Sequence, residues 1–242
     1  METYAVMFKG VEGDGVGTPV PAEISEVLAK YEDLMPNELP KKLPRRPVVD
    51  HSFELELGKQ PPAKAPYRLS GPELEELKRQ LKELADAGFI RPSRSPYGAP
   101  VLFQRKKYSN ELGMCCDYRA LNKQTVRNRY PLPLAVDCFD KLVKARVFSK
   151  LDLRHGYYQV RIAEGDEKKT AIVTRYGSFE FLVMPFGLCN APGTFGTLMN
   201  DVLRPYLDSF VVVYLDDIVV YSDNMEDHKK HLAMVFKALR EN

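Results

Sequence analysis

The chain has 242 residues, of which 44% are hydrophobic and 28% are charged, proportions that are ordinary for a folded protein and exclude disorder over the whole length. No apolar run reaches the roughly 18 residues that a membrane-spanning helix needs, so no membrane partner is expected. The formal net charge is only +2, but residues 101–130 carry seven basic side chains and two acidic ones. Such a cluster can bind phosphates, although a solvated basic surface would be the favoured explanation if this were the only signal.

The first predicted elements lie in and just after a proline-rich stretch. Residues 1–66 contain nine prolines and no strong hydrophobic period, which predicts an extended lead-in with one short helix near Ile24–Tyr31. The clearest helix runs from Ser70 to Gly88. Ser70 and Glu73 form a capping-box pattern, and leucines recur on one face.

The remaining elements alternate between strands and helices. Residues 99–117 predict two strands joined by a hairpin near Ser109. Helices and mainly antiparallel strands mix without a regular βαβ repeat, so the fold class is α+β. The later elements expected are a helix at 134–145, strands at 147–153, 157–162, 170–174 and 179–183, a helix at 192–207, a strand hairpin at 210–222 and a helix at 225–240.

Two adjacent carboxylates interrupt the most apolar part of the sequence. Asp216 and Asp217 lie within residues 211–221 (VVVYLDDIVVY), between two β-branched runs that require burial. Burying two acids together is unfavourable unless they lie at an exposed tip or bind a cation. They could simply fill a two-residue turn, but Asp-Asp suits such a turn poorly because both central residues need positive φ.

A third acid, Asp152, ends another apolar run, residues 148–153 (FSKLDL). Alone it could be a charged residue at a solvated strand end. Together with Asp216 and Asp217 it could present oxygen ligands from neighbouring strands, which is the ligand set that Mg²⁺ prefers. Two such ions can activate an attacking 3′-hydroxyl and stabilise a leaving pyrophosphate, so the implied reaction is nucleotidyl transfer.

Several segments in series resemble the ordered motifs of gypsy-type LTR retrotransposon reverse transcriptases. They are residues 114–122 (MCCDYRALN), 128–133 (NRYPLP), 148–153, 181–188 (FLVMPFGL), 190–192 (NAP) and 214–217 (YLDD), preceded by Leu39-Pro40, Asp50-His51, Tyr67-Arg68-Leu69 and residues 93–96 (SRSP). The resemblance covers about residue 20 to the end.

The resemblance implies the fingers and palm of a right-hand polymerase, with an antiparallel palm sheet packed on helices. Residues 1–66 would be the lead-in, 67–145 mainly fingers, and 146–242 mainly palm with part of the fingers. The sequence ends at Asn242, so we expect the thumb to be absent and synthesis to be weakly processive. The implied partners are a primer on an RNA or DNA template, dNTPs, and RNase H and integrase regions of a parent polyprotein.

The resemblance also implies a role for each candidate site residue. The catalytic acids are Asp152, Asp216 and Asp217, which would hold two Mg²⁺ ions, or Mn²⁺, together with the carbonyl of Leu153. Tyr157 would lie under the incoming sugar and exclude a ribose 2′-hydroxyl, although Tyr157 and Phe186 could also be plain core aromatics. The remaining implied contacts are Lys106, His155 and Gly156 to the triphosphate, Phe186 and Gly187 beneath the nucleotide, and Arg119 and Asn122 to the template.

Some positions depart from the family pattern. Gly113 replaces an arginine that grips the triphosphate, and the loss of a charged contact there weakens transition-state stabilisation. Gly193 and Gly196 place two glycines in a predicted helix, at about 1 kcal/mol each. These changes suggest a decayed or repurposed copy.

Two hypotheses therefore stay open at the level of sequence. The first is an RNA-directed DNA polymerase core, truncated and weakened. The second is a domesticated, non-catalytic protein that binds nucleic acid or a protein partner. The four cysteines show no zinc or disulfide spacing, which favours a reducing compartment, and with no export signal we expect a cytoplasmic or nuclear location.

Overall fold

Two β-sheets organise the protein, and each belongs to a different compact unit. The computed structural model describes residues 4–8, 20–35, 42–44, 49–105, 112–130, 135–143, 145–153, 156–214 and 217–241. The first unit comprises Met1–Glu38, Tyr130–Arg154 and Phe195–Asn242, and the second comprises Leu39–Arg129 and His155–Thr194. Both units are thus built from segments that are distant in sequence. The assignment of residues 67–145 to fingers and 146–242 to palm stays a prediction.

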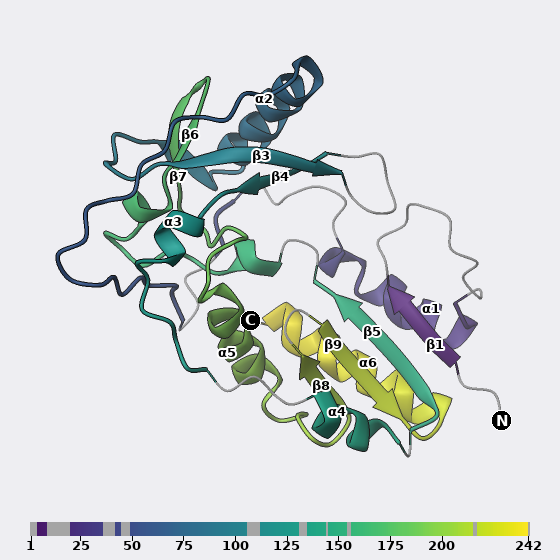
Figure 1. Cartoon of the computed structure of the whole chain (residues 1–242). Coiled ribbons are helices and arrows are strands. Elements are labelled where there is room, and N and C mark those ends of the chain that lie inside the picture. Colours follow the sequence, from purple (N-terminus) through teal and green to yellow (C-terminus); the bar gives the residue numbers. More distant parts are fainter. Residues whose placement is uncertain are drawn as a thin grey trace. The chain divides into compact units, whose positions relative to one another are not determined.

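The sheet of the first unit has four strands in the order β1-β5-β9-β8 (Figure 1). β9 pairs antiparallel with both β5 and β8, whereas β1 pairs parallel with β5. Residues along β5 alternate between buried and more exposed positions, the pattern of a strand with one covered face. The strand bounds are Tyr4–Phe8 for β1, Val147–Asp152 for β5, Val211–Tyr214 for β8 and Asp217–Ser222 for β9.

Helix α6 (Met225–Glu241) covers one face of this sheet (Figure 1). It buries Leu232, Val235 and Phe236, and each such side chain stabilises the fold by about 1.5–3 kcal/mol. The Phe236 ring also packs on Tyr31, with centroids 5.5 Å apart, just after α1 (Ala22–Lys30). The other helices with residues in this unit are α4 (Ala135–Leu142), which contacts β8, and α5 (Ala191–Leu203), which begins in the second unit.

The sheet of the second unit has five strands in the order β2-β7-β6-β3-β4. Helix α2 (Gly71–Asp86) contacts β2 and β4 and buries Leu77, Leu81 and Leu84. The Ser70 amide donates to Glu73 Oε2 at 2.7 Å and the Ser70 side chain caps the Glu73 backbone in return, so the expected capping box is confirmed. The remaining bounds are Ile90–Pro92 for β2, Ala99–Arg105 for β3, Leu112–Cys116 for β4, Arg119–Asn122 for α3, Ile172–Thr174 for β6 and Gly177–Phe181 for β7.

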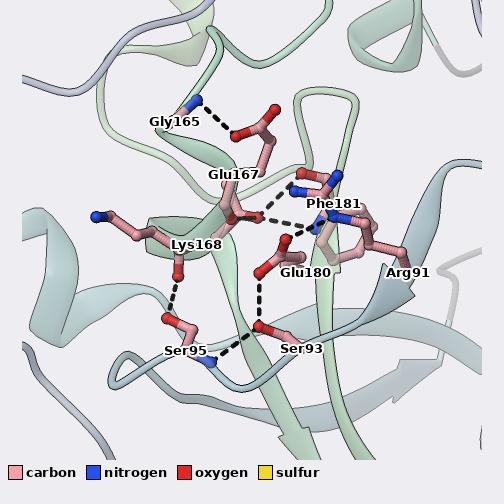
Figure 2. A network of polar contacts seen from close by, with 9 residues as sticks. Arg91, Ser93, Ser95, Gly165, Glu167, Lys168, Glu180 and Phe181 are labelled. Atoms are coloured by element: carbon pink, nitrogen blue, oxygen red, sulfur yellow. Dashed lines mark hydrogen bonds and ion pairs between the residues drawn. The ribbon is translucent and has the colours of Figure 1, made fainter.

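A polar network fixes the loop at residues 93–96 to this sheet (Figure 2). The buried Glu180 carboxylate accepts hydrogen bonds from Arg91 Nε at 2.7 Å and from Ser93 Oγ at 2.5 Å. Ser93 Oγ in turn accepts from the Ser95 amide at 3.1 Å, and Ser95 Oγ donates to the Lys168 carbonyl at 2.6 Å. The serines of this segment therefore have a structural role, because their hydroxyls join the segment to Glu180 and to the Lys168 carbonyl.

The structure differs from the predicted elements in several places. The strand expected at 157–162 is wrong: Gly156–Gln159 form a 3₁₀ helix, and only Arg161 and Ile162 make isolated bridges. Here the packing of the Tyr158 ring on Phe89 and Phe181 overrides the β-propensity of Tyr and Val. β1 was not predicted, and the helix expected at 192–207 ends at Leu203.

The other predicted helices and strands are present to within a few residues. The turns expected at Ser109 and at Asp216 lie outside the described residues. Within the described part of the chain, no helix has the length and apolar character needed to span a membrane.

Candidate active site

Two of the three candidate acids face each other across the first unit's sheet. Asp152 is the last residue of β5 and Asp217 the first of β9, and they are direct partners in the antiparallel register. Directly opposed residues project from the same face, with Cβ atoms about 4.5–5.5 Å apart. Ser149 and Leu151 are buried, so Asp152 projects from the face opposite to them. The structure thus brings together two acids that are 65 positions apart in sequence.

A lysine lies on the same face as the two acids. Lys150 precedes Asp152 by two residues, and its Nζ lies 2.9 Å from Asp217 Oδ2. The two side chains of this pair are 43% and 42% exposed, and Asp152 is exposed. The acids are therefore accessible to a ligand from solvent.

The donor set fits a divalent cation of the kind that prefers oxygen. Two opposed carboxylates repel each other, and an ion that binds both offsets that repulsion. Mg²⁺ commonly takes one or two protein carboxylates and completes its shell with phosphate and water. No cluster of three His, Cys, Asp or Glu side chains with metal-binding geometry occurs among the described residues. Asp216 lies outside them, and Leu153 follows directly after β5 and is partly buried.

The candidate nucleotide-binding residues that can be described belong to the second unit. The Tyr157 ring lies 4.5 Å from that of Phe186, centroid to centroid, at an interplanar angle of 47°. Tyr157 is buried, whereas Phe186 is 50% exposed. Gly156 is buried beside Tyr157 in the same 3₁₀ helix. The half-exposed Phe186 ring could present a flat apolar face to a ligand.

Gly187 occupies a position that no other residue fits well. Its φ of +97° lies in a region that side chains with a Cβ rarely adopt. A Cβ there would lie 3.2 Å from the Cys116 carbonyl oxygen and 3.5 Å from Tyr118 Cδ2. The loop after Phe186 is therefore pressed against the end of β4.

Asn122 holds this same loop from the other side. Its Nδ2 donates to the Gly187 carbonyl at 2.8 Å, and its Oδ1 accepts from the Cys189 amide at 3.0 Å. Both the nitrogen and the oxygen of its side-chain amide thus form hydrogen bonds with the backbone of the loop. This geometry gives Asn122 a positioning role, and its predicted contact with template stays a prediction.

Arg119 is oriented by a buried acid that the sequence did not single out. Asp117 accepts hydrogen bonds from Arg119 Nε at 2.7 Å, from Arg119 Nη2 at 2.8 Å and from the Tyr67 hydroxyl at 2.6 Å. Lys64 Nζ lies 3.5 Å from the same carboxylate, whose side chain is 2% exposed. Arg119 and Tyr67 hold the pKa of the Asp117 carboxyl well below its ordinary range, against the effect of burial. The Arg119 side chain itself is 74% exposed.

The remaining candidates and departures are placed as follows. Lys106 and His155, like Asp216, lie outside the described residues. Gly113 lies in β4, where a Cβ would meet only the Gln104 carbonyl oxygen at 3.5 Å, so a side chain fits there. Gly196 lies against Tyr130, with 3.1 Å from an added Cβ to Cε1, and Asn200 Nδ2 donates to the Tyr130 hydroxyl at 2.5 Å.

Two signals in the sequence could have pointed to the residues that were missed. Lys150 stands two residues before Asp152, so both project from one face of a strand. Asp117 stands two residues before Arg119, within reach of a local ion pair. Its other partners, Tyr67 and Lys64, come from about fifty residues earlier, and no local pattern reveals them.

Comparisons with known proteins show which family the chain resembles. Residues 105–242 match the family described as reverse transcriptase (RNA-dependent DNA polymerase). An RNA-directed DNA polymerase homolog from Oenothera berteroana is 64% identical over 127 residues, which are 51% of this chain and 89% of that protein. The retrovirus-related Pol polyprotein from transposon gypsy of Drosophila melanogaster is 39% identical over 165 residues, 66% of this chain and 16% of the polyprotein.

Solved structures include proteins with a similar fold. The foamy viral protease-reverse transcriptase, determined in complex with an RNA/DNA hybrid, superposes with a TM-score of 0.79 at 22% identity, over 92% of this chain and 30% of that one. Structural similarity at 22% sequence identity shows only that the fold is shared. With the family profile and the close relatives, it shows that this chain belongs to the reverse transcriptase family and has the mixed α/β fold of its fingers and palm.

Proposed function

We propose that this chain is the catalytic core of an RNA-directed DNA polymerase, which adds dNTPs to a primer on a template. The observation that carries the proposal is the direct pairing of Asp152 with Asp217 at the ends of β5 and β9. The chain spans only 16% of the gypsy polyprotein, so the activity of the longer protein is part of the proposal. So is binding of an RNA or DNA template, which the RNA/DNA hybrid bound by the foamy viral relative supports.

In the proposed reaction the primer 3′-oxygen forms a bond to the α-phosphorus of a dNTP, and the bond to pyrophosphate breaks. Bound Mg²⁺, for which Mn²⁺ could substitute, would promote loss of the hydroxyl proton and stabilise the charge on the pyrophosphate. Asp152, Asp216, Asp217 and the Leu153 carbonyl would hold the two ions. Asp152 and Asp217 lie at accessible strand ends, which leaves room for phosphate and water as further ligands.

The residues of the second unit would bind and orient the nucleotide and template. Tyr157 would lie under the deoxyribose and exclude a 2′-hydroxyl, with Phe186 and Gly187 beneath it. The backbone of His155 and Gly156 and the ammonium of Lys106 would bind phosphate oxygens, which needs no base recognition. Arg119, held by Asp117, would contact the template, and Asn122 would position the loop at Gly187.

Primer extension tests the proposal. The wild-type chain should extend a primer on an RNA template with dNTPs and Mg²⁺, and Asp152→Asn should lower the rate by more than about a hundredfold, because a neutral amide binds a hard cation poorly. Asp223→Asn removes an exposed acid just beyond the other end of β9 and should leave the rate unchanged. If wild type and Asp152→Asn are equally silent at high protein concentration, the enzymatic proposal fails.

A non-catalytic nucleic-acid-binding role is the second candidate, favoured by Gly113, which stands where the family pattern has an arginine. In that case the protein would bind RNA or DNA without extending a primer. Phosphate contacts weaken as salt rises, so a gel shift between roughly 50 and 200 mM salt would detect them. Salt-sensitive binding by a chain that does not extend primers would support this candidate.

A further inference from the structure

Lys150 occupies a position that the nucleotidyl-transfer chemistry does not require. Its alkyl chain shares the exposed face of β5 with Asp152, and its ammonium lies 2.9 Å from Asp217 Oδ2 rather than pointing into solvent. The strand register places Asp217 opposite Asp152 and Val219 opposite Lys150. The ion pair thus runs diagonally across β5 and β9 to an acid that a cation would also bind.

From this geometry we infer that Lys150 is an internal counter-ion: in the metal-free protein it neutralises Asp217, and a divalent cation must displace it before Asp217 can act as a ligand. The inference rests on the proposed function, since it assigns Asp217 to a cation site. Lys150 is a positioning residue, because it acts on the ion through Asp217.

Two physical arguments support this role. Opposed carboxylates repel each other, and the positive charge of Lys150 offsets that repulsion when no ion is bound. Both partners are also more than two-fifths exposed, and ion pairs of that exposure are weak. A cation with twice the charge can therefore compete for Asp217, whereas a buried ion pair would resist it.

A consequence is that Lys150 lowers the affinity of the site for divalent ions. Replacing it by methionine keeps the apolar stem and removes the positive charge that competes with the ion. At a separation of several ångströms and under ordinary salt, we expect this to tighten binding by about three- to tenfold. Lys150→Arg keeps the charge and should bind the ion as the wild type does.

Titration with Mn²⁺, followed by the electron paramagnetic resonance signal of the free ion and without nucleotide or primer, tests the inference independently of activity. Lys150→Met should bind Mn²⁺ more tightly than the wild type. Lys229→Met is the matched control, because Lys229 is about as exposed as Lys150 and forms an ion pair with Glu26 between α6 and α1. It should leave the affinity unchanged.

A double-mutant cycle shows whether Lys150 acts through Asp217. In an Asp217→Asn background, Lys150→Met should change the affinity by less than about twofold, because the ion pair is already lost. An undiminished effect in that background, or no effect in the wild-type background, overturns the inference.

The Asp152→Asn variant tests the proposed function separately from the role of Lys150. If Asp152→Asn weakens Mn²⁺ binding while Lys150→Met has no effect, the proposed function survives and only the role of Lys150 fails. If Asp152→Asn leaves Mn²⁺ binding unchanged, both fail.

Discussion

The two units hold their candidate residues in different ways. In the first unit Asp152 and Asp217 project from strand ends, and the contact that ties Asp217 to a neighbour is the exposed ion pair with Lys150. In the second unit Gly187 is confined by its backbone angle and by Cys116, and Asn122 bonds the same loop twice. Asp217 is thus tied by an exposed ion pair, whereas the loop at Gly187 is fixed by several contacts.

Asp117, in the second unit, is a buried acid held by several contacts, so we expect its replacement to have a large effect on stability. We expect Asp117→Asn to lower the free energy of unfolding by about 3 kcal/mol, because Arg119, Lys64 and the Tyr67 hydroxyl lose a buried charge partner. The free energy is measured by urea unfolding at pH 7.

The matched control is Asp201→Asn, which removes an acid from an exposed pair with Arg204. It should cost less than about 1 kcal/mol. The folded-state pKa of Asp117 is depressed, so its contribution is present above the ordinary pKa of an aspartate and is lost as the pH falls below it. If both variants lowered the free energy of unfolding equally, Asp117 would be held no more firmly than Asp201, and the contrast between the two units would be wrong.

A buried histidine in each unit extends the comparison to pH. His228 lies between Ser149 and Ser222, whose hydroxyls are each 2.8 Å from one of its ring nitrogens, and burial lowers its pKa to about 4. His51 bonds Thr194 Oγ1 at 2.8 Å, and burial lowers its pKa to about 4 as well, although Asp166 opposes the shift.

Because both folded pKa values lie below the unfolded value, stability is complete above about pH 6.5 and is lost as the pH falls towards 4. We expect each histidine to account for about 2 kcal/mol of the difference between pH 7 and pH 4.5. His228→Gln and His51→Gln cannot titrate, so urea unfolding at the two pH values should show a smaller difference for each. An unchanged difference would show that the histidine does not remain neutral in the folded protein.

Gly187 tests how firmly the second unit fixes its loop. Gly187→Ala should lower the free energy of unfolding by about 2 kcal/mol, since the new Cβ meets both the backbone strain and the Cys116 carbonyl. Gly165→Ala has a similar φ of +87° but nothing within 4 Å of the added atom, so it should cost about 1 kcal/mol. If the two variants cost the same in urea unfolding, the contact with Cys116 contributes nothing.

A substitution at Gly113 is expected to raise the rate of primer extension instead of lowering stability. Its Cβ position is in ordinary contact with Gln104, so Gly113→Arg fits without displacing backbone. A guanidinium near the triphosphate should raise the rate of primer extension several-fold, while Gly113→Ala, which has the same backbone consequence without the charge, should not. Equal rates for the two variants would show that an arginine at this position gains no contact with the nucleotide.

Local signals explain which parts of the fold the sequence predicted. The helix α2 follows from its capping residues and its leucine period, and β8 and β9 follow from their β-branched runs. β1 could not be found this way, because β5, the strand with which it pairs in the described part of the chain, lies about 140 residues later. Residues 157–162 have strand-like composition but are held by contacts of their aromatic rings.

The sequence likewise predicted some features of the candidate site and missed others. The sequence predicted that Asp152, Asp216 and Asp217 could come from neighbouring strands of one sheet, and β5 and β9, which carry Asp152 and Asp217, are neighbours. The dual bonding of Asn122 and the buried partners of Asp117 depend on backbone geometry and on side chains from elsewhere in the chain, which periodicity does not reveal. The sequence therefore indicated the acids and aromatics better than the residues that hold them.

The central claim is that Asp152 and Asp217 form part of one divalent-cation site. Anomalous diffraction from crystals of the wild-type chain grown with Mn²⁺, a primer-template and a dNTP measures this directly. The account predicts manganese peaks within about 2–2.3 Å of oxygens of Asp152 and Asp217. Manganese bound to the nucleotide with no peak at Asp152 would contradict it.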